Sequence, residues 1–201
     1  DFDRFRKSDK DHFKKAIAPN GERILVHTSN FRKVKRVEDV IHIFKEVYQE
    51  IPSKLLLIGD GPERHHLEEL CRKIGLCHEI RFLGKQDAIE ELLAIADLFL
   101  MPSEMESFGL AALEAMACEV PVISTDVGGL PEVNIHGKTG FLSKVGDVES
   151  MAGHAINILS HDDILNEFRK NAMEQAKRFD IHEILPQYEA YYESILKTAV
   201  W

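Results

Sequence analysis

Residues 54–74 read KLLLIGDGPERHHLEELCRKI and contain a complete strand, turn and helix pattern. The apolar run 54–58 has the length of a buried strand. The glycines and proline of residues 59–62 predict a tight turn that leads into a helix, since Pro62 suits a first helical turn. Apolar residues then recur at the spacing of one helix face, namely Leu67, Leu70, Cys71 and Ile74. The stretch therefore predicts a buried strand followed by an amphipathic helix.

The same alternation extends in both directions along the chain. Further strand patterns lie at 24–28, 79–83, 97–101, 121–125 and 140–142, and further helical patterns lie at 37–50, 88–96 and 108–117. Short strands that are apolar on both faces and separated by helices predict a parallel sheet covered on each side. We expect an α/β fold with a Rossmann-like parallel sheet of about six strands and helices on both faces.

The last part of the chain has helical patterns only, at 148–159, 162–178 and 181–197. We therefore expect one domain over residues 1–201, in which 148–201 is a helical extension that caps the sheet or reaches towards a neighbouring domain. The first residues, DFDRFR, lack an initiator Met and the layout of a signal peptide. This beginning favours a piece of a longer protein.

Composition excludes several classes of protein. The chain has 201 residues with 25 Lys and Arg against 34 Asp and Glu, so its net charge of -9 disfavours a nucleic-acid binder. No apolar run approaches the roughly 18 residues of a membrane span. The three cysteines, Cys71, Cys77 and Cys118, form no CxxC pair, and we expect reduced, buried thiols and a cytoplasmic protein.

The loop after the first strand carries a basic cluster. Residues 29–36 read SNFRKVKR, with four cations in five residues. Ligands of an open parallel sheet bind at the carboxyl ends of its strands, so these cations are candidates to grip a phosphate. A solvated basic loop is the alternative. No GxGxxG follows this strand, which disfavours a nicotinamide dinucleotide; the glycines from Gly59 make a tight turn or approach a ligand, and both possibilities stay open.

The loop after the fourth strand carries two carboxylates. Residues 102–114 read PSEMESFGLAALE, and a helix from Phe108 would point the free N–H groups of residues 107–110 at the crevice. Glu114 falls in an apolar helix and needs a partner such as a diol, unless it faces solvent. Glu106 and Glu114 would lie about 12 Å apart along a helix, too far for a glycosidase pair and suited to opposite ends of an elongated ligand.

The remaining loops add glycines and no metal pattern. The pair Gly128 and Gly129 follows the fifth strand, where paired glycines let backbone approach a phosphate and Glu132 begins a short helix. The ten histidines show no zinc-like spacing with carboxylates. We therefore expect neither a metal nor another cofactor.

Together these residues resemble the carboxyl-terminal, nucleotide-sugar-binding half of retaining glycosyltransferases with the two-domain GT-B architecture, in family 4. The most specific part is the E-x7-E motif from Glu106 to Glu114. It is supported, in the family's order, by LIGDGP at 57–62, RFLG at 81–84, GGLPE at 128–132 and GKTGF at 137–141. The resemblance covers essentially the whole chain and implies a UDP-sugar donor as partner and an acceptor-binding amino-terminal domain that is absent here.

The resemblance implies a role for each matching residue. Lys35 would neutralise the donor diphosphate, and Glu114 would bind the ribose hydroxyls. The family's arginine position holds Asn30, so Arg32 is the candidate substitute. Glu106 would hold the donor sugar with the backbone of Ser107, Phe108, Gly109 and Leu110, while the backbone of Arg81 would recognise the base and Gly59 would lie beside the donor.

Within the family, SNFRKVKRV at 29–37 and GKQD at 84–87 resemble the branch that transfers N-acetylglucosamine from its UDP donor to L-malate, the first step of bacillithiol synthesis. The implied chemistry is front-face displacement in which Arg32 and Lys35 stabilise charge on the departing UDP. Two alternatives stay open: a noncatalytic nucleotide-sugar-binding module, and part of a UDP-sugar epimerase, for which E-x7-E is the wrong signature.

Overall fold

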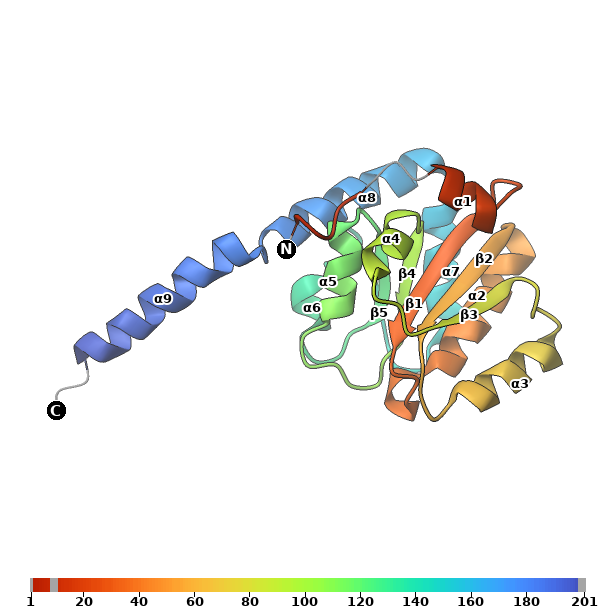
Figure 1. Cartoon of the computed structure of the whole chain (residues 1–201), viewed down its shortest axis with the longest axis horizontal. Coiled ribbons are helices and arrows are strands. Elements are labelled where there is room, and N and C mark those ends of the chain that lie inside the picture. The colour runs from red at the N-terminus through yellow and green to blue at the C-terminus, as the bar shows by residue number, and fades with distance from the viewer. Residues whose placement is uncertain (1, 8–10, 199–201) are drawn as a thin grey trace.

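The computed structural model describes residues 2–7 and 11–198, which form a parallel α/β domain with a projecting carboxyl-terminal helix (Figure 1). Its six strands are all paired in parallel in the order β3-β2-β1-β4-β5-β6. They are β1 (Arg23–Ser29), β2 (Ser53–Gly59), β3 (Ile80–Gly84), β4 (Leu98–Met101), β5 (Val122–Thr125) and β6 (Gly140–Ser143). The expected parallel sheet is confirmed.

Helices cover both faces of the sheet, because successive strand residues point to opposite sides. One core joins Ile24 of β1 and Phe99 of β4 to α4 (Ile89–Ala94), α5 (Leu110–Ala117) and α6 (Leu130–Val133). The other joins Leu25 of β1 and Leu100 of β4 to α2 (Val37–Glu50), α3 (Arg64–Ile74) and α7 (Val148–Leu159). The helices on both faces that the apolar strands predict are thus present.

A short helix near the amino terminus was not expected. This helix, α1 (Asp11–Ile17), packs against the sheet through Ile17. Its Lys14 ammonium donates to the fully buried carboxylate of Asp97 at 2.9 Å, and Arg169 of α8 (Asp162–Lys177) pairs with the same carboxylate. The backbone N–H of Ile24 also donates to Asp97, at 2.9 Å. Asp97 therefore ties segments from both ends of the chain to the middle of the sheet.

Other predictions need correction at the ends of elements. The helix expected from Pro62 begins at Arg64, and the one expected from Phe108 begins at Leu110. Cys71 and Cys118 are buried free thiols as expected, but Cys77 is exposed, because it lies in the turn between α3 and β3. The expected helical extension is present as α7, α8 and α9 (Ile181–Thr198).

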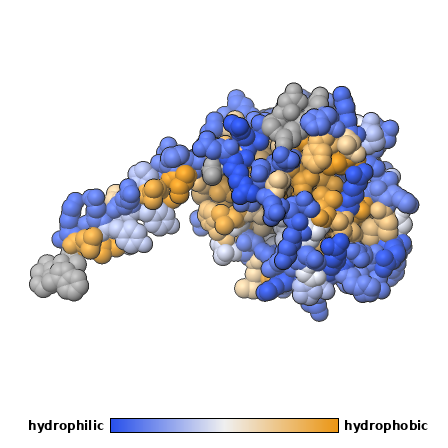
Figure 2. Space-filling view, viewed as in Figure 1, coloured by the Kyte–Doolittle hydropathy of each residue, from blue (hydrophilic) through white to orange (hydrophobic). Residues whose placement is uncertain are grey.

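The helix α9 leaves the body of the domain and carries apolar side chains into solvent (Figures 1 and 2). Its exposed large side chains are Ile181, Leu185, Tyr188, Tyr191, Tyr192, Ile195 and Leu196. They recur mostly at spacings of three and four, which places them along one side of the helix. Among the described residues, no helix is both long and apolar enough to span a membrane.

Candidate functional site

The loops after β1 and β4 meet at the point where the strand order reverses. The chain builds β1, β2 and β3 outward, then returns to place β4 on the other side of β1. In open α/β sheets, the crevice outside the carboxyl ends of two such strands is the usual ligand site. Here the backbone N–H of Glu104 donates to the carbonyl of Val34 at 2.8 Å, so the two loops are in direct contact.

An ion pair joins the two loops. The ammonium of Lys35, at the end of the short 3-10 turn η1 (Lys33–Lys35), lies 2.6 Å from Oε2 of Glu106. The two side chains are 21% and 13% exposed, so the pair is largely shielded from water. A shielded cation beside a carboxylate offers a charge for an anion and an acceptor for hydroxyl groups within one small site. The structure thus brings together two residues for which the sequence analysis expected neighbouring roles.

Glycines after β2 support the loop after β1. A Cβ atom at Gly59, which has φ +121°, would lie 1.8 Å from the carbonyl oxygen of Ser29. A Cβ atom at Gly61 would lie 1.9 Å from the carbonyl oxygen of Asn30. Of the two interpretations left open for this turn, the structure supports close packing of backbone on backbone.

The glycine pair after β5 supports the loop after β4 in the same way. A Cβ atom at Gly128, which has φ +55°, would lie 1.7 Å from the carbonyl oxygen of Glu106, and one at Gly129 would lie 2.6 Å from that of Ser107. These glycines therefore admit the backbone that carries Glu106 at the place where the sequence analysis expected room for a phosphate. Glu132, expected to begin a short helix, lies in the first turn of α6.

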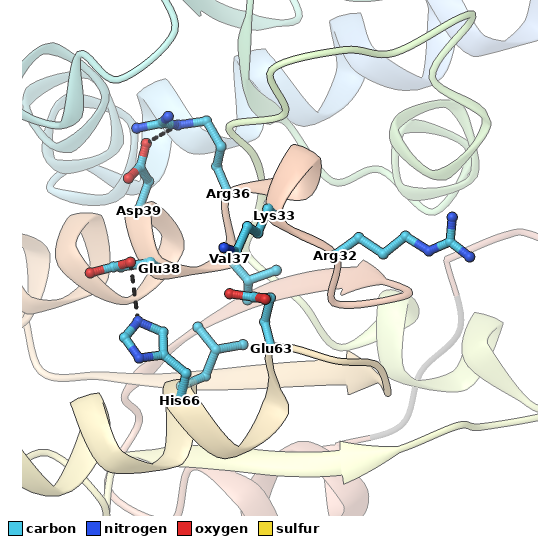
Figure 3. Close-up of a pocket in the computed structure, with 9 residues that line it drawn as sticks. Arg32, Lys33, Arg36, Val37, Glu38, Asp39, Glu63 and His66 are labelled. Carbon is cyan, nitrogen blue, oxygen red and sulfur yellow. Dashed lines mark hydrogen bonds and ion pairs between the residues drawn. The ribbon is translucent and has the colours of Figure 1, made fainter.

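The basic cluster is divided between different partners. Arg36 donates to Asp39 at 2.7 Å, and this hydrogen bond raises the pKa of Arg36. Arg32 and Lys33 are exposed and have no carboxylate partner among the described residues, and they line a pocket of about 490 Å³ between α2 and α3. Figure 3 shows Arg36 turned to Asp39, while the guanidinium of Arg32 extends away from this pair. Arg32 is therefore an exposed cation, three residues before Lys35, that is available to an anion.

Glu114 lies in an apolar groove on the outer side of α5. The groove also contains Phe2, Phe5, Leu113 and Phe179 and has a volume of about 450 Å³. Burial raises the pKa of the Glu114 carboxyl, and the Arg4 charge opposes this shift. Since no hydrogen-bond partner lies within the described part of the chain, Glu114 is a half-buried carboxylate able to accept hydroxyl donors.

The backbone N–H groups expected to face the crevice lie only partly at the start of α5. The first helical hydrogen bond of α5 runs from Leu113 N–H to the Gly109 carbonyl, so its free N–H groups begin at Leu110 instead of Ser107. Phe108 packs edge-on against Phe179 at 5.7 Å between ring centroids. As a result the E-x7-E stretch is only partly helical, and the 12 Å spacing taken from a continuous helix does not apply to it.

Two expected residues lie outside the contact between the loops. Asn30 is exposed at the end of β1. Arg81 is the second residue of β3, paired with Leu56 in the middle of β2, and three residues before the carboxyl end of its strand at Gly84. The structure therefore does not bring Arg81 to the rim where Lys35 and Glu106 lie.

Sequence reasoning missed two polar residues beneath the site. The hydroxyl of Ser103 is buried and has no hydrogen-bond partner among the described residues, and its carbonyl accepts from the Thr125 hydroxyl at 2.6 Å. His27 is fully buried in β1 directly below the basic loop. A lone histidine within the apolar strand RILVHTS was the available signal. In residues 2–7 and 11–198, no group of three or more His, Cys, Asp or Glu is arranged to hold a metal ion.

Comparison with known proteins assigns the chain to a family. Residues 8–178 match the family model described as glycosyl transferases group 1. The chain belongs to this family. It is 48% identical over 177 residues to N-acetyl-alpha-D-glucosaminyl L-malate synthase of Bacillus anthracis, a match that covers 88% of this chain and 46% of that protein.

Solved structures of the fold also resemble this group 1 chain. Sucrose-phosphate synthase from Thermosynechococcus elongatus has a TM-score of 0.86 at 26% identity, covering 99% of this chain and 51% of that one. Anabaena HepE in complex with UDP-glucose has a TM-score of 0.86 at 27% identity, and the match covers 96% of this chain and 55% of that one. The chain thus spans about half the length of each of these three proteins.

Proposed function

We propose that this chain is the donor-binding domain of a retaining glycosyltransferase and that it binds a UDP-sugar between the loops after β1 and β4. The observation that carries the proposal is the shielded Lys35–Glu106 pair at the reversal of strand order. A nucleoside diphosphate sugar presents a dianionic diphosphate next to a ring of hydroxyl groups, and this pair offers one group suited to each part.

The residues divide the donor between them. Lys35 and Arg32 bind the diphosphate, and they stabilise the charge that develops on UDP as the bond to the sugar breaks. Glu106 and the backbone of residues 107–110 hold the sugar, while Glu114 accepts from the ribose hydroxyls. Asn30 lies beside the donor in the loop that packs on Gly59, and the backbone of Arg81, on the edge strand β3 and away from the Lys35–Glu106 pair, recognises the base at the other end of the nucleotide.

We propose UDP-N-acetylglucosamine as the donor and L-malate as the acceptor. The support is the 48% identity to the synthase of Bacillus anthracis named above and the resemblance of residues 29–37 to that branch of the family. The departing UDP oxygen takes part in deprotonating the acceptor hydroxyl, on the face of the sugar from which UDP leaves. We further propose a cytoplasmic location, which the three free cysteines support.

The acceptor belongs to a further domain in this proposal. The synthase of Bacillus anthracis is about twice as long as the chain, and the exposed apolar side of α9 is suited to pack against such a domain. Front-face displacement needs the acceptor within about 3 to 3.5 Å of the reacting carbon, so the 201 residues alone should not transfer sugar at an enzymatic rate.

Calorimetry on the 201-residue chain tests donor binding. UDP should bind more tightly than ADP and GDP, and its affinity should fall as salt is raised. Lys35→Ala and Arg32→Ala should each weaken UDP binding by roughly 1.5 to 3 kcal/mol, because each substitution removes a charge-assisted hydrogen bond. Lys33→Ala is the matched control and should change little. Equal affinity for UDP, ADP and GDP would refute the uridine assignment.

A further inference from the structure

A chain of hydrogen bonds runs from the core of the sheet to the basic loop. The ring of His27 lies 2.8 Å from the carbonyl of Leu100 through Nδ1 and 2.8 Å from Oγ of Ser29 through Nε2. Oγ of Ser29 in turn accepts from the backbone N–H of Phe31 at 3.2 Å. Three bonds therefore connect β4, the buried imidazole and the first turn of the loop after β1.

The direction of each bond follows from the chemistry of the groups. A carbonyl only accepts, so Nδ1 of His27 carries the hydrogen. Burial, together with a smaller contribution from the Lys35 charge, lowers the pKa of His27 to about 4 although the hydrogen bond to the Leu100 carbonyl opposes the shift, so the ring is neutral at pH 7. Nε2 is then a bare acceptor, and the Ser29 hydroxyl must donate to it. This donation leaves the Ser29 oxygen lone pairs directed at the Phe31 N–H.

The Phe31 N–H belongs to a backbone turn that needs support. Phe31 has φ +38°, a left-handed conformation that is uncommon for residues other than glycine. Its side chain is fully buried, and its carbonyl accepts from the Glu63 N–H at 3.0 Å. The next residue is Arg32, whose carbonyl accepts from the Lys35 N–H at 2.8 Å. The turn at Phe31 therefore sets where the two proposed diphosphate ligands stand.

We propose that His27 and Ser29 are positioning residues that hold the turn at Phe31 in the conformation that directs Arg32 and Lys35 to the donor diphosphate. The inference rests on the proposed function and deepens it, because it assigns the geometry of the diphosphate subsite to a buried pair that does not touch the donor. Because these two residues hold the loop after β1 in its binding conformation before the donor arrives, the loop loses less conformational freedom when the diphosphate binds.

Binding of UDP and of uridine to the 201-residue chain tests the inference, since uridine lacks both phosphates. Ser29→Ala should weaken UDP about five- to tenfold, the effect of one net hydrogen bond, and leave uridine unchanged. Ser29→Thr keeps the hydroxyl and should restore UDP affinity. His27→Phe keeps the ring stacked near Phe99 and should resemble Ser29→Ala, with no further loss in the double variant. Thr28→Val, on the opposite side of β1, is the matched control and should bind UDP like the wild type.

Imidazole nitrogen NMR supplies an independent readout: His27 should show the Nδ1–H tautomer, and Ser29→Ala should shift its Nε2 resonance. Normal UDP affinity in both Ser29→Ala and His27→Phe would overturn the inference. Equal losses for UDP and uridine would also overturn it, because they would indicate general damage to the domain. Absence of UDP binding by the wild type would instead refute the proposed function.

Discussion

Glu106→Gln should strengthen UDP binding, because the native carboxylate lies beside the cation that the diphosphate needs. Oε2 of Glu106 is 2.6 Å from the Lys35 ammonium. A phosphate oxygen bound to another side of that ammonium would place its charge about 5 Å from the carboxylate. Two unit charges at that distance repel by roughly 3 kcal/mol at an effective dielectric constant of about 20. Partial exposure of the pair and salt reduce this repulsion by about half, so removing it should increase UDP affinity about tenfold.

Titration calorimetry with UDP at low and high salt measures the effect. The gain should shrink as salt rises, since it arises from a charge. Glu104→Gln is the matched control: it removes an equal charge two residues earlier from an exposed position, and it should leave UDP affinity almost unchanged. In a Lys35→Gln background the ammonium no longer offsets the carboxylate, so Glu106→Gln should produce at least as large a gain.

Two results would refute this reasoning. Unchanged or weaker UDP binding by Glu106→Gln would mean that the carboxylate does not oppose the diphosphate. An equal gain from Glu104→Gln would mean that the overall negative charge of the chain, and not the Lys35–Glu106 pair, limits binding.

Three further substitutions, one of them with a matched control, test the stability of the fold. Gly128→Ala should destabilise the domain by about 3 kcal/mol in urea unfolding, because its Cβ atom would lie 1.7 Å from the backbone of the loop after β4, whereas Gly153→Ala in α7, with open space around it, should stabilise by about 0.5 to 1 kcal/mol. Burial raises the pKa of Glu114, so the charged carboxylate destabilises the fold. Glu114→Gln should therefore raise the melting temperature at pH 7, and this gain should disappear as the pH falls below the usual carboxyl pKa of 4.5. A lower melting temperature of Glu114→Gln at pH 7 would mean that the native carboxylate has a stabilising partner. Asp97→Asn should cost roughly 3 kcal/mol, since it leaves two basic partners beside a fully buried neutral group, and a cost under about 1 kcal/mol in chemical unfolding would contradict that role.

Local patterns in the sequence determined most of the secondary structure. The strand and helix of residues 54–74 follow from periodicities that complete themselves within a few residues, and the same holds for each later unit. The starts of α3 and α5 and the presence of α1 escaped this reasoning. Gly109 adopts φ +94° and delays the start of α5 to Leu110, and α1 is a short helix whose support comes from Asp97, far away in the chain.

The candidate site depended both on the local sequence and on the tertiary structure. The sequence determined that cations follow β1 and carboxylates follow β4, because those residues lie next to the strands that position them. Only the tertiary structure decided that these loops adjoin, through the placement of β4 against β1, and that Lys35 meets Glu106 across 71 residues of chain. It alone shows the glycines packed on the backbones of both loops and His27 beneath the turn at Phe31. The physical reason is that strand order is selected by burial over the whole chain, whereas periodicity reports only the nearest neighbours of each residue.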